Sequence, residues 1–168
     1  MSMVRRSGLA AVAGIICALA APPAPADAAL IMRKELSHEI ALTIAEGALQ
    51  ACLARGYATS AVVVDRDGET LVAMRGDGAG IHTMENARRK AYTANTFKQP
   101  TKDYAKKLQD PNSVAHQQVT LPSVIAIDGG VPIKVGNEVI GAAGLSGSPG
   151  VDSECVQAGI DKVKDQLQ

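Results

Sequence analysis

The stretch GGVPIKVGNEVIGAAGLSG at residues 129–147 decides the fold. Two apolar runs, at 131–135 and 138–140, are separated by Gly136 and Asn137, a pair that tolerates positive φ and is typical of a two-residue hairpin turn. Glycines then recur at every third position of GAAGLSG, where a missing side chain lets another backbone approach closely. The stretch therefore predicts an antiparallel strand pair that runs into a glycine-rich loop.

The rest of the chain alternates between helical and strand patterns. Apolar residues at helical spacing predict four helices, over 36–55, 84–98, 101–108 and 151–167, with Ser37 as a candidate N-cap of the first. The run at 61–65 is β-branched and nearly all apolar, which is typical of a strand covered on both faces, and a turn at 66–68 leads into a second strand at 70–74. The stretch 123–127 is compatible with a further strand or with an edge segment.

The order of these elements indicates the class of fold. Hairpin-linked strands with helices grouped between them favour an antiparallel sheet covered by helices over a doubly wound parallel sheet. Pro132 removes one donor from the strand ladder, so its strand is expected at an edge of the sheet, where subunits can meet. The predicted class is α+β, in a single domain.

Composition excludes several classes of function. The 168 residues carry a formal net charge of zero, which argues against a nucleic-acid partner. Aromatic residues make up 2% of the chain, so a base-stacking surface is not expected. The sequence has no Ser-His-Asp order, no H-E-x-x-H motif and no phosphate-binding G-K-S/T loop. We therefore assign no catalytic residues from the sequence.

Residues 1–28 have the pattern of a secretory signal peptide. Arg5 and Arg6 precede an apolar run at 9–21, and A-x-A patterns follow that suit cleavage after Ala26 or Ala28. The alternative is an uncleaved anchor. No later run is long enough to cross a membrane, so we expect residues 29–168 to form one exported domain, periplasmic or secreted, without a membrane span.

Export changes the expected role of the cysteines. Cleavage removes Cys17 and leaves Cys52 and Cys155, an even pair in an oxidising compartment. Cys52 lies near the end of the first predicted helix and Cys155 near the start of the last, so a disulfide is expected if these helices lie side by side. A metal or redox pair is the alternative, although the two cysteines lack C-x-x-C spacing.

Four blocks of the chain carry a family resemblance: VVVDRDG at 62–68, ARRKAYTA at 87–94, GGVPIKVGNEVIGAAGLSG at 129–147 and DSECVQAGI at 152–160. Together they resemble the GlcG/HbpS-like heme-binding family (DUF336), which includes the C-terminal domain of some PduO-type cobalamin adenosyltransferases. The resemblance covers nearly all of 29–168. It implies a five-stranded antiparallel sheet with helices on both faces, a profilin-like or Roadblock-like architecture, and assembly into homo-oligomers.

The same resemblance implies a function. It favours an exported protein that binds heme, or a related tetrapyrrole, in sensing, storage or delivery without catalytic turnover. The alternative is an accessory subunit or enzyme linked to the oxidation of small organic acids or to corrinoid cofactor metabolism. A purely structural oligomer is a third alternative.

Histidines are the first candidates for an iron ligand, because heme iron needs only one or two axial ligands. His82 is preferred as the metal ligand, since it stands at the mouth of the predicted second helix, directly after a glycine-rich loop. The alternative role of His82 is a helix cap. Thr83 is a candidate cap or oxygen contact to the metal, and His116 is a candidate from an irregular region. His38 is expected to face solvent or to cap the first helix.

Arg88 and Arg89 form a cationic group beside the glycine-rich loop. An Arg fork pairs with a carboxylate bidentately, so these side chains are candidates to hold porphyrin propionates. The alternative is a solvated helix face on which Glu85 pairs with Arg89 at i,i+4. Lys90 can instead point inward, with its stem packed on the sheet.

Overall fold

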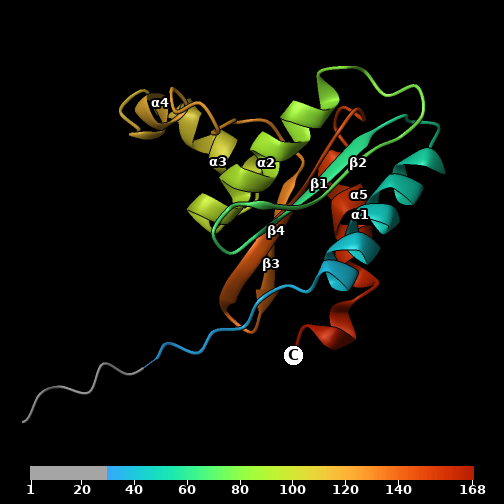
Figure 1. The fold of residues 1–168 in the computed structure, drawn as a ribbon. Coiled ribbons are helices and arrows are strands. Elements are labelled where there is room, and N and C mark those ends of the chain that lie inside the picture. The colour runs from blue at the N-terminus through green and yellow to red at the C-terminus, as the bar shows by residue number, and fades with distance from the viewer. Residues whose placement is uncertain (1–29) are drawn as a thin grey trace, which may run out of the picture. The chain divides into compact units, whose positions relative to one another are not determined.

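Four antiparallel strands form the sheet, in the spatial order β2-β1-β4-β3 (Figure 1). They are β1 (Ser60–Asp65), β2 (Thr70–Arg75), β3 (Gly130–Val135) and β4 (Glu138–Ser146). The computed structural model describes residues 30–168, so the predicted signal peptide lies outside the described residues. Both predicted hairpins are confirmed, and Pro132 lies in β3, which is an edge strand as expected.

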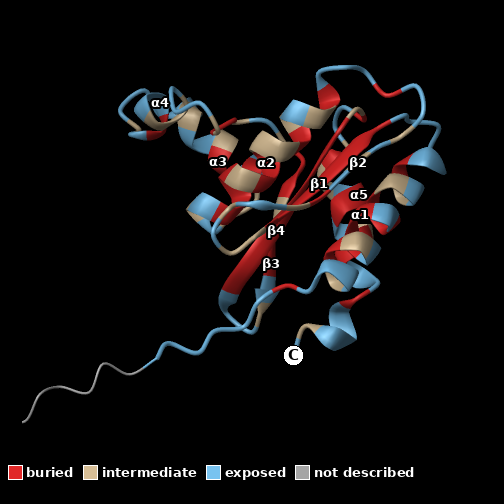
Figure 2. Ribbon diagram, in the orientation of Figure 1, coloured by how far each residue is buried: buried red, intermediate tan, exposed pale blue. Residues whose placement is uncertain are grey.

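Helices cover both faces of this sheet. On one face lie α1 (His38–Leu53) and α5 (Asp152–Asp161), and on the other lies α2 (Thr83–Phe97). Side chains of β1 alternate between the two layers, with Val63 packed in the α1/α5 core and Val62 and Val64 packed against α2. Both β1 and β4 are therefore buried along most of their length (Figure 2), which explains why 61–65 reads as a continuous apolar run.

Short helices complete the described chain. They are α3 (Thr101–Lys106), η1 (Lys107–Gln109), α4 (Ala115–Gln118) and η2 (Lys164–Gln166). The predicted N-cap of α1 is confirmed, because the hydroxyl of Ser37 accepts a hydrogen bond from the Ile40 amide at 3.2 Å. Within residues 30–168, none of the helices has the length and apolar composition that crossing a bilayer requires.

The expectation of five strands is wrong, although the α+β class is confirmed. The described residues contain four strands, and 123–127 is not one of them. Its backbone bonds to α2 side chains instead, since the Ile125 amide donates to Thr93 Oγ1 at 2.9 Å and Arg89 Nη2 donates to the Val124 carbonyl at 2.5 Å. A segment whose polar groups are satisfied in this way needs no neighbouring strand.

Glycines let α2 approach the sheet through its backbone. A Cβ atom on Gly144 of β4 would lie 2.1 Å from the carbonyl oxygen of Ala87, and one on Gly130 of β3 would lie 2.2 Å from that of Lys90. On the other face, a Cβ on Gly159 would lie 2.3 Å from the Ile44 carbonyl oxygen of α1. The glycines expected to allow close approach therefore do so between helix and sheet and between two helices.

The Gly144 contact predicts a large effect on stability. Gly144→Ala is expected to lower the free energy of unfolding by about 3 kcal/mol or more, because α2 must move away from the sheet to admit the methyl group. Gly136→Asn is the control, since Gly136 has a φ of 58° that Asn tolerates and no atom of residues 30–168 lies within 4 Å of an added Cβ. Urea unfolding measures both, and equal stabilities of the two variants would contradict this packing.

The predicted disulfide between Cys52 and Cys155 is present. Its Cα atoms lie 5.6 Å apart, and the bond joins the last turn of α1 to the first turn of α5 across a sequence separation of 103 residues. The two helices pack side by side in one core cluster, which is the arrangement on which the prediction depended.

Removing this crosslink should destabilise the protein. The double variant Cys52→Ala/Cys155→Ala is expected to lose about 3 to 5 kcal/mol of unfolding free energy, because a long loop in the unfolded chain is no longer closed. Urea unfolding of this variant and of the oxidised wild type measures the difference. Two free thiols in mass spectrometry of the non-reduced wild type would refute the crosslink.

Candidate functional site

A cavity of about 450 Å³ lies at the N-terminal ends of α2 and α5. Its volume is within the range of small-molecule sites in proteins. The walls come from the chain before β1, from both helix starts, from 127–128 and from the loop after β4. The lining residues are Ala58, Gly80, His82, Thr83, Asn86, Lys90, Ile127, Asp128, Ser146, Gly147, Pro149, Gly150 and Asp152.

A buried ion pair joins the two helices at this cavity. Lys90 of α2 is 1% exposed and Asp152 of α5 is 5% exposed, and their Nζ and Oδ2 atoms lie 2.6 Å apart. Lys90 Nζ also donates to the Leu145 carbonyl of β4 at 3.0 Å. The second carboxylate oxygen of Asp152 accepts from the amide and the hydroxyl of Ser148, at 2.8 and 2.6 Å. Both buried charges are thus paired and hydrogen-bonded, as burial of charge requires.

Gly129 makes room for this ion pair. Its φ of 122° lies in the region that favours glycine, and its carbonyl accepts from the Leu145 amide at 2.9 Å. A Cβ atom at this position would lie 2.6 Å from Asp152 Cβ and 3.0 Å from Lys90 Nζ. The pair therefore depends on glycine at position 129.

The disulfide lies directly beside the same group of side chains. The Ser148 hydroxyl oxygen is 2.9 Å from Cys52 Sγ and also bonds to Asp152. Because a disulfide sulfur carries no proton, the Ser148 hydroxyl is the donor in this group, and it donates to the carboxylate. The loop after β4 is consequently held between the α1–α5 crosslink and the Lys90–Asp152 pair.

His82 stands on the wall of the cavity, immediately before α2. Its carbonyl accepts a hydrogen bond from the Asn86 amide at 3.0 Å, but among the described residues its side chain makes no capping hydrogen bond. The ring lies against Gly80, where an added Cβ would be 3.0 Å from Cε1 and 3.2 Å from Nδ1. The imidazole is exposed, so it is accessible to a ligand in the cavity.

Thr83 also lines the cavity, but its hydroxyl has two partners within the protein. It donates to the Gly80 carbonyl at 2.7 Å and lies 2.7 Å from the hydroxyl of Ser60, and the residue is 2% exposed. Because the Thr83 hydroxyl donates its proton to the Gly80 carbonyl, the Ser60 hydroxyl must be the donor to the Thr83 oxygen. These bonds fix the glycine-rich loop to β1 and thereby place His82.

The other sequence candidates lie away from the cavity lining. Arg88 makes two hydrogen bonds of 2.9 Å to Glu85, which lower the pKa of the Glu85 carboxyl and raise the pKa of Arg88. Glu85 therefore pairs with Arg88 at i,i+3, and the alternative pairing with Arg89 was wrong.

Arg89 donates a hydrogen bond to the Val124 carbonyl. His116 is exposed on α4, with Nε2 3.1 Å from the Asp110 carbonyl oxygen. The structure thus brings together only His82 and Thr83 of the five candidates.

Four polar residues of the cavity wall were not among the residues predicted from the sequence: Asn86, Asp128, Ser146 and Asp152. Lys90 carries the clearest sequence signal for an inward orientation, because it lies three residues after Ala87 and one before Ala91 on the buried stripe of α2. A charge on such a stripe indicates a buried partner. The partner itself is 62 residues away, and no local pattern identifies it.

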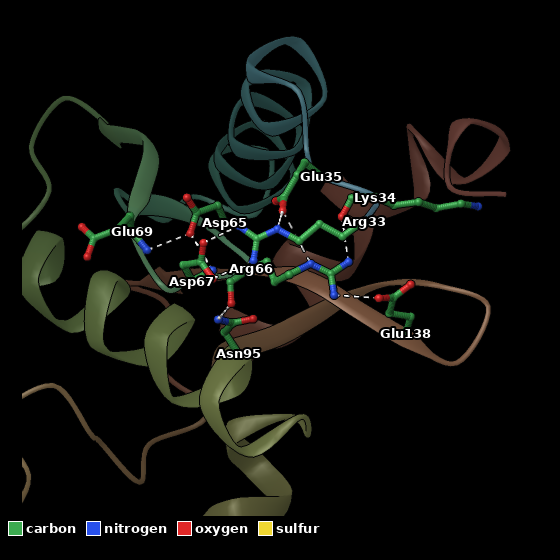
Figure 3. A network of polar contacts seen from close by, with 9 residues as sticks. All are labelled: Arg33, Lys34, Glu35, Asp65, Arg66, Asp67, Glu69, Asn95 and Glu138. Atoms are coloured by element: carbon green, nitrogen blue, oxygen red, sulfur yellow. Dashed lines mark hydrogen bonds and ion pairs between the residues drawn. The ribbon is translucent and has the colours of Figure 1, made fainter. Parts of the chain in front are cut away.

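A second group of charged residues lies at the far end of β1 and is structural (Figure 3). Arg66 pairs with Glu138 at 2.7 Å and donates to the Lys34 carbonyl at 2.7 Å, while Arg33 pairs with Asp67 at 2.7 Å. The hydrogen bonds from Arg33 lower the pKa of Asp67. These pairs connect the segment before α1 to both hairpin turns. Their partners are largely solvent-exposed, so each contributes little to stability.

The buried ion pair predicts a measurable coupling. Lys90→Met is expected to lower the free energy of unfolding by about 3 to 5 kcal/mol, because Asp152 would be left buried without a counter-charge. The double variant Lys90→Met/Asp152→Asn should lose less than the sum of the single variants, by about 1 kcal/mol or more. Urea unfolding of the four proteins measures the coupling, and additive losses would show that the pair does not act as a unit.

Comparison with known proteins identifies relatives of this chain. An uncharacterised 15.0 kDa protein in the dhaT-dhaS intergenic region of Citrobacter freundii is 37% identical over 86 residues. The aligned stretch covers 51% of this chain and 61% of the Citrobacter protein, so it spans less than two thirds of that relative.

Solved structures share the fold. The crystal structure of an HbpS double mutant from Streptomyces reticuli has 34% sequence identity and a TM-score of 0.76, covering 86% of this chain and 97% of HbpS. The PduOC:heme complex has 23% identity and a TM-score of 0.70 over 75% of this chain and 93% of PduOC, which shows a common fold. Residues 36–161 match the family model described as haem degrading protein HbpS-like. The chain belongs to the HbpS-like family, as the four sequence blocks indicated.

Proposed function

We propose that this protein binds heme, or a closely related tetrapyrrole, in the cavity at the starts of α2 and α5, with His82 as the iron ligand. The observation that carries the proposal is the exposed imidazole of His82 on the wall of a cavity of about 450 Å³, without a capping bond of its own. Membership of a family described by heme chemistry supports the same ligand class.

The residues present suit this group. Bound heme supplies an iron that already carries four pyrrole nitrogens, so a single imidazole is a sufficient protein ligand. Ala58, Ile127 and Pro149 give the wall apolar surface for the macrocycle. Because Nδ1 and Cε1 of His82 are the ring atoms that lie near Gly80, Nε2 is the natural donor to iron.

The chain holds this histidine in place rather than leaving it on a free loop. The Thr83 hydroxyl bonds fix the start of α2 to β1, and the Lys90–Asp152 pair fixes α2 to α5. A ligand site mounted in this way is pre-organised, which lowers the entropic cost of binding. Arg88, Arg89 and His116 remain predicted contacts, and each must leave a partner or approach from outside the cavity to reach the ligand.

We further propose that the protein acts outside the cytoplasm in heme sensing, storage or delivery. The disulfide supports an oxidising compartment, where such bonds form and persist. The outer edge of β3 is the proposed contact surface of a homo-oligomer, because an unpaired strand edge can accept a second chain.

Hemin titration followed by the Soret band tests the binding proposal. The wild type should bind saturably at micromolar hemin, and His82→Ala should weaken binding by about tenfold or more, because the iron loses its protein ligand. His38→Ala is the matched control, since His38 is exposed outside the cavity lining, and His116→Ala tests the second candidate ligand. If the wild type shows no saturable binding of hemin, the proposal is refuted. If His82→Ala binds hemin as tightly as the wild type, His82 is not the iron ligand.

A further inference from the structure

The charges of the side chains that line the cavity do not sum to zero. Lys90 is the single Lys or Arg among the lining residues, and its charge is taken up by Asp152 at 2.6 Å and by the Leu145 carbonyl. Asp128 is a second carboxylate on the same wall. Counting Lys, Arg, Asp and Glu side chains, the described lining therefore carries one negative charge that no Lys or Arg of the wall offsets.

Asp128 is held at the cavity wall with one carboxylate oxygen bonded and the other buried. Its Oδ2 atom accepts a hydrogen bond from Ser153 Oγ at 3.0 Å, at the first turn of α5, where the helix dipole favours an anion. Its Oδ1 atom is buried and has no hydrogen-bond partner among the described residues. The carboxylate is thus held in a fixed position beside the cavity with one side unused.

The nearby arginines do not offset this charge. Arg88 is engaged by Glu85, and Arg89 bonds to the Val124 carbonyl, and neither side chain lines the cavity. A carboxylate that entered the cavity would therefore meet the Asp128 charge, and like charges repel. An apolar edge of a ligand would instead contact Pro149 and Ile127, and Ile127 is 48% exposed at the cavity wall.

We propose that Asp128 is a specificity-determining residue that excludes ligand carboxylates from the cavity, so that a tetrapyrrole enters by its apolar edge and keeps its propionates in solvent. This inference rests on the proposed function and adds the orientation and the class of tetrapyrrole that the site accepts. Heme carries both propionates on one edge, so its opposite edge satisfies this requirement. Tetrapyrroles with carboxylates on every pyrrole ring do not.

Three iron porphyrins test the inference on the full folded protein: hemin, hemin dimethyl ester and iron coproporphyrin, which has a propionate on each ring. For the wild type, hemin and its dimethyl ester should bind equally, within about threefold, because the propionates lie outside the cavity. Iron coproporphyrin should bind about tenfold more weakly than hemin, or worse, because one carboxylated edge must enter.

Asp128→Asn is the decisive variant, since it removes the charge and keeps the size and the acceptor for Ser153. It should reduce the preference for hemin over iron coproporphyrin by about fivefold or more, because the repulsion of the entering carboxylates is removed. Asp103→Asn is the matched control, because Asp103 is an exposed carboxylate paired with Lys106 on α3. Urea unfolding verifies that both variants are folded.

The outcomes separate the two proposals. If hemin binds in a His82-dependent manner but the preference is absent, or persists in Asp128→Asn, the role of Asp128 is overturned and the heme site stands. If hemin does not bind to the wild type, the heme proposal and the inference that rests on it are both overturned.

Discussion

The buried ion pair between Lys90 and Asp152 is the interaction on which the rest of the site depends. Two charges removed from water are unfavourable unless both are fully bonded. Here the ammonium group also bonds to the Leu145 carbonyl, and the carboxylate also bonds to Ser148. Four elements of the chain therefore meet at one point: α2, β4, the loop after β4 and α5. Their meeting sets the separation between the starts of the two helices, and the cavity occupies that space.

Small residues make this meeting possible. Gly144 and Gly130 let the backbone of α2 lie directly on the sheet, and Gly129 leaves room for the ion pair itself. On the opposite face, Gly159 brings α5 against α1, where the disulfide joins them. The glycine-rich segment 129–147 thus has a mainly structural role. It affects ligand binding indirectly, because it sets the positions of α2 and α5 on the sheet.

Local features of the sequence were sufficient to predict much of the fold. The Gly136-Asn137 turn, the Ser37 cap and the doubly covered run at 61–65 each depend on neighbours within a few residues, and the structure contains all three. The disulfide was predictable because an even pair of cysteines lay at the ends of two predicted helices. The family blocks implied one strand too many, since 123–127 satisfies its backbone through Thr93 and Arg89 of α2.

The candidate site was less predictable, because its polar contacts join residues distant in sequence. His82 was found from its position after a glycine-rich loop. Asp128 and Asp152 carry no local signal, and the partner of Lys90 is 62 residues away. The choice between Arg88 and Arg89 as the partner of Glu85 depends on side-chain direction, which spacing on a helix leaves open.

The central claim is that the cavity between the starts of α2 and α5 is the heme site of this chain. A crystal structure of the protein with bound hemin tests it most directly. The account predicts iron coordinated by His82, with the macrocycle against Ile127 and its propionates directed into solvent. A macrocycle bound at His116, or on the exposed face of α2 beside Arg88, with the cavity unoccupied, would contradict it.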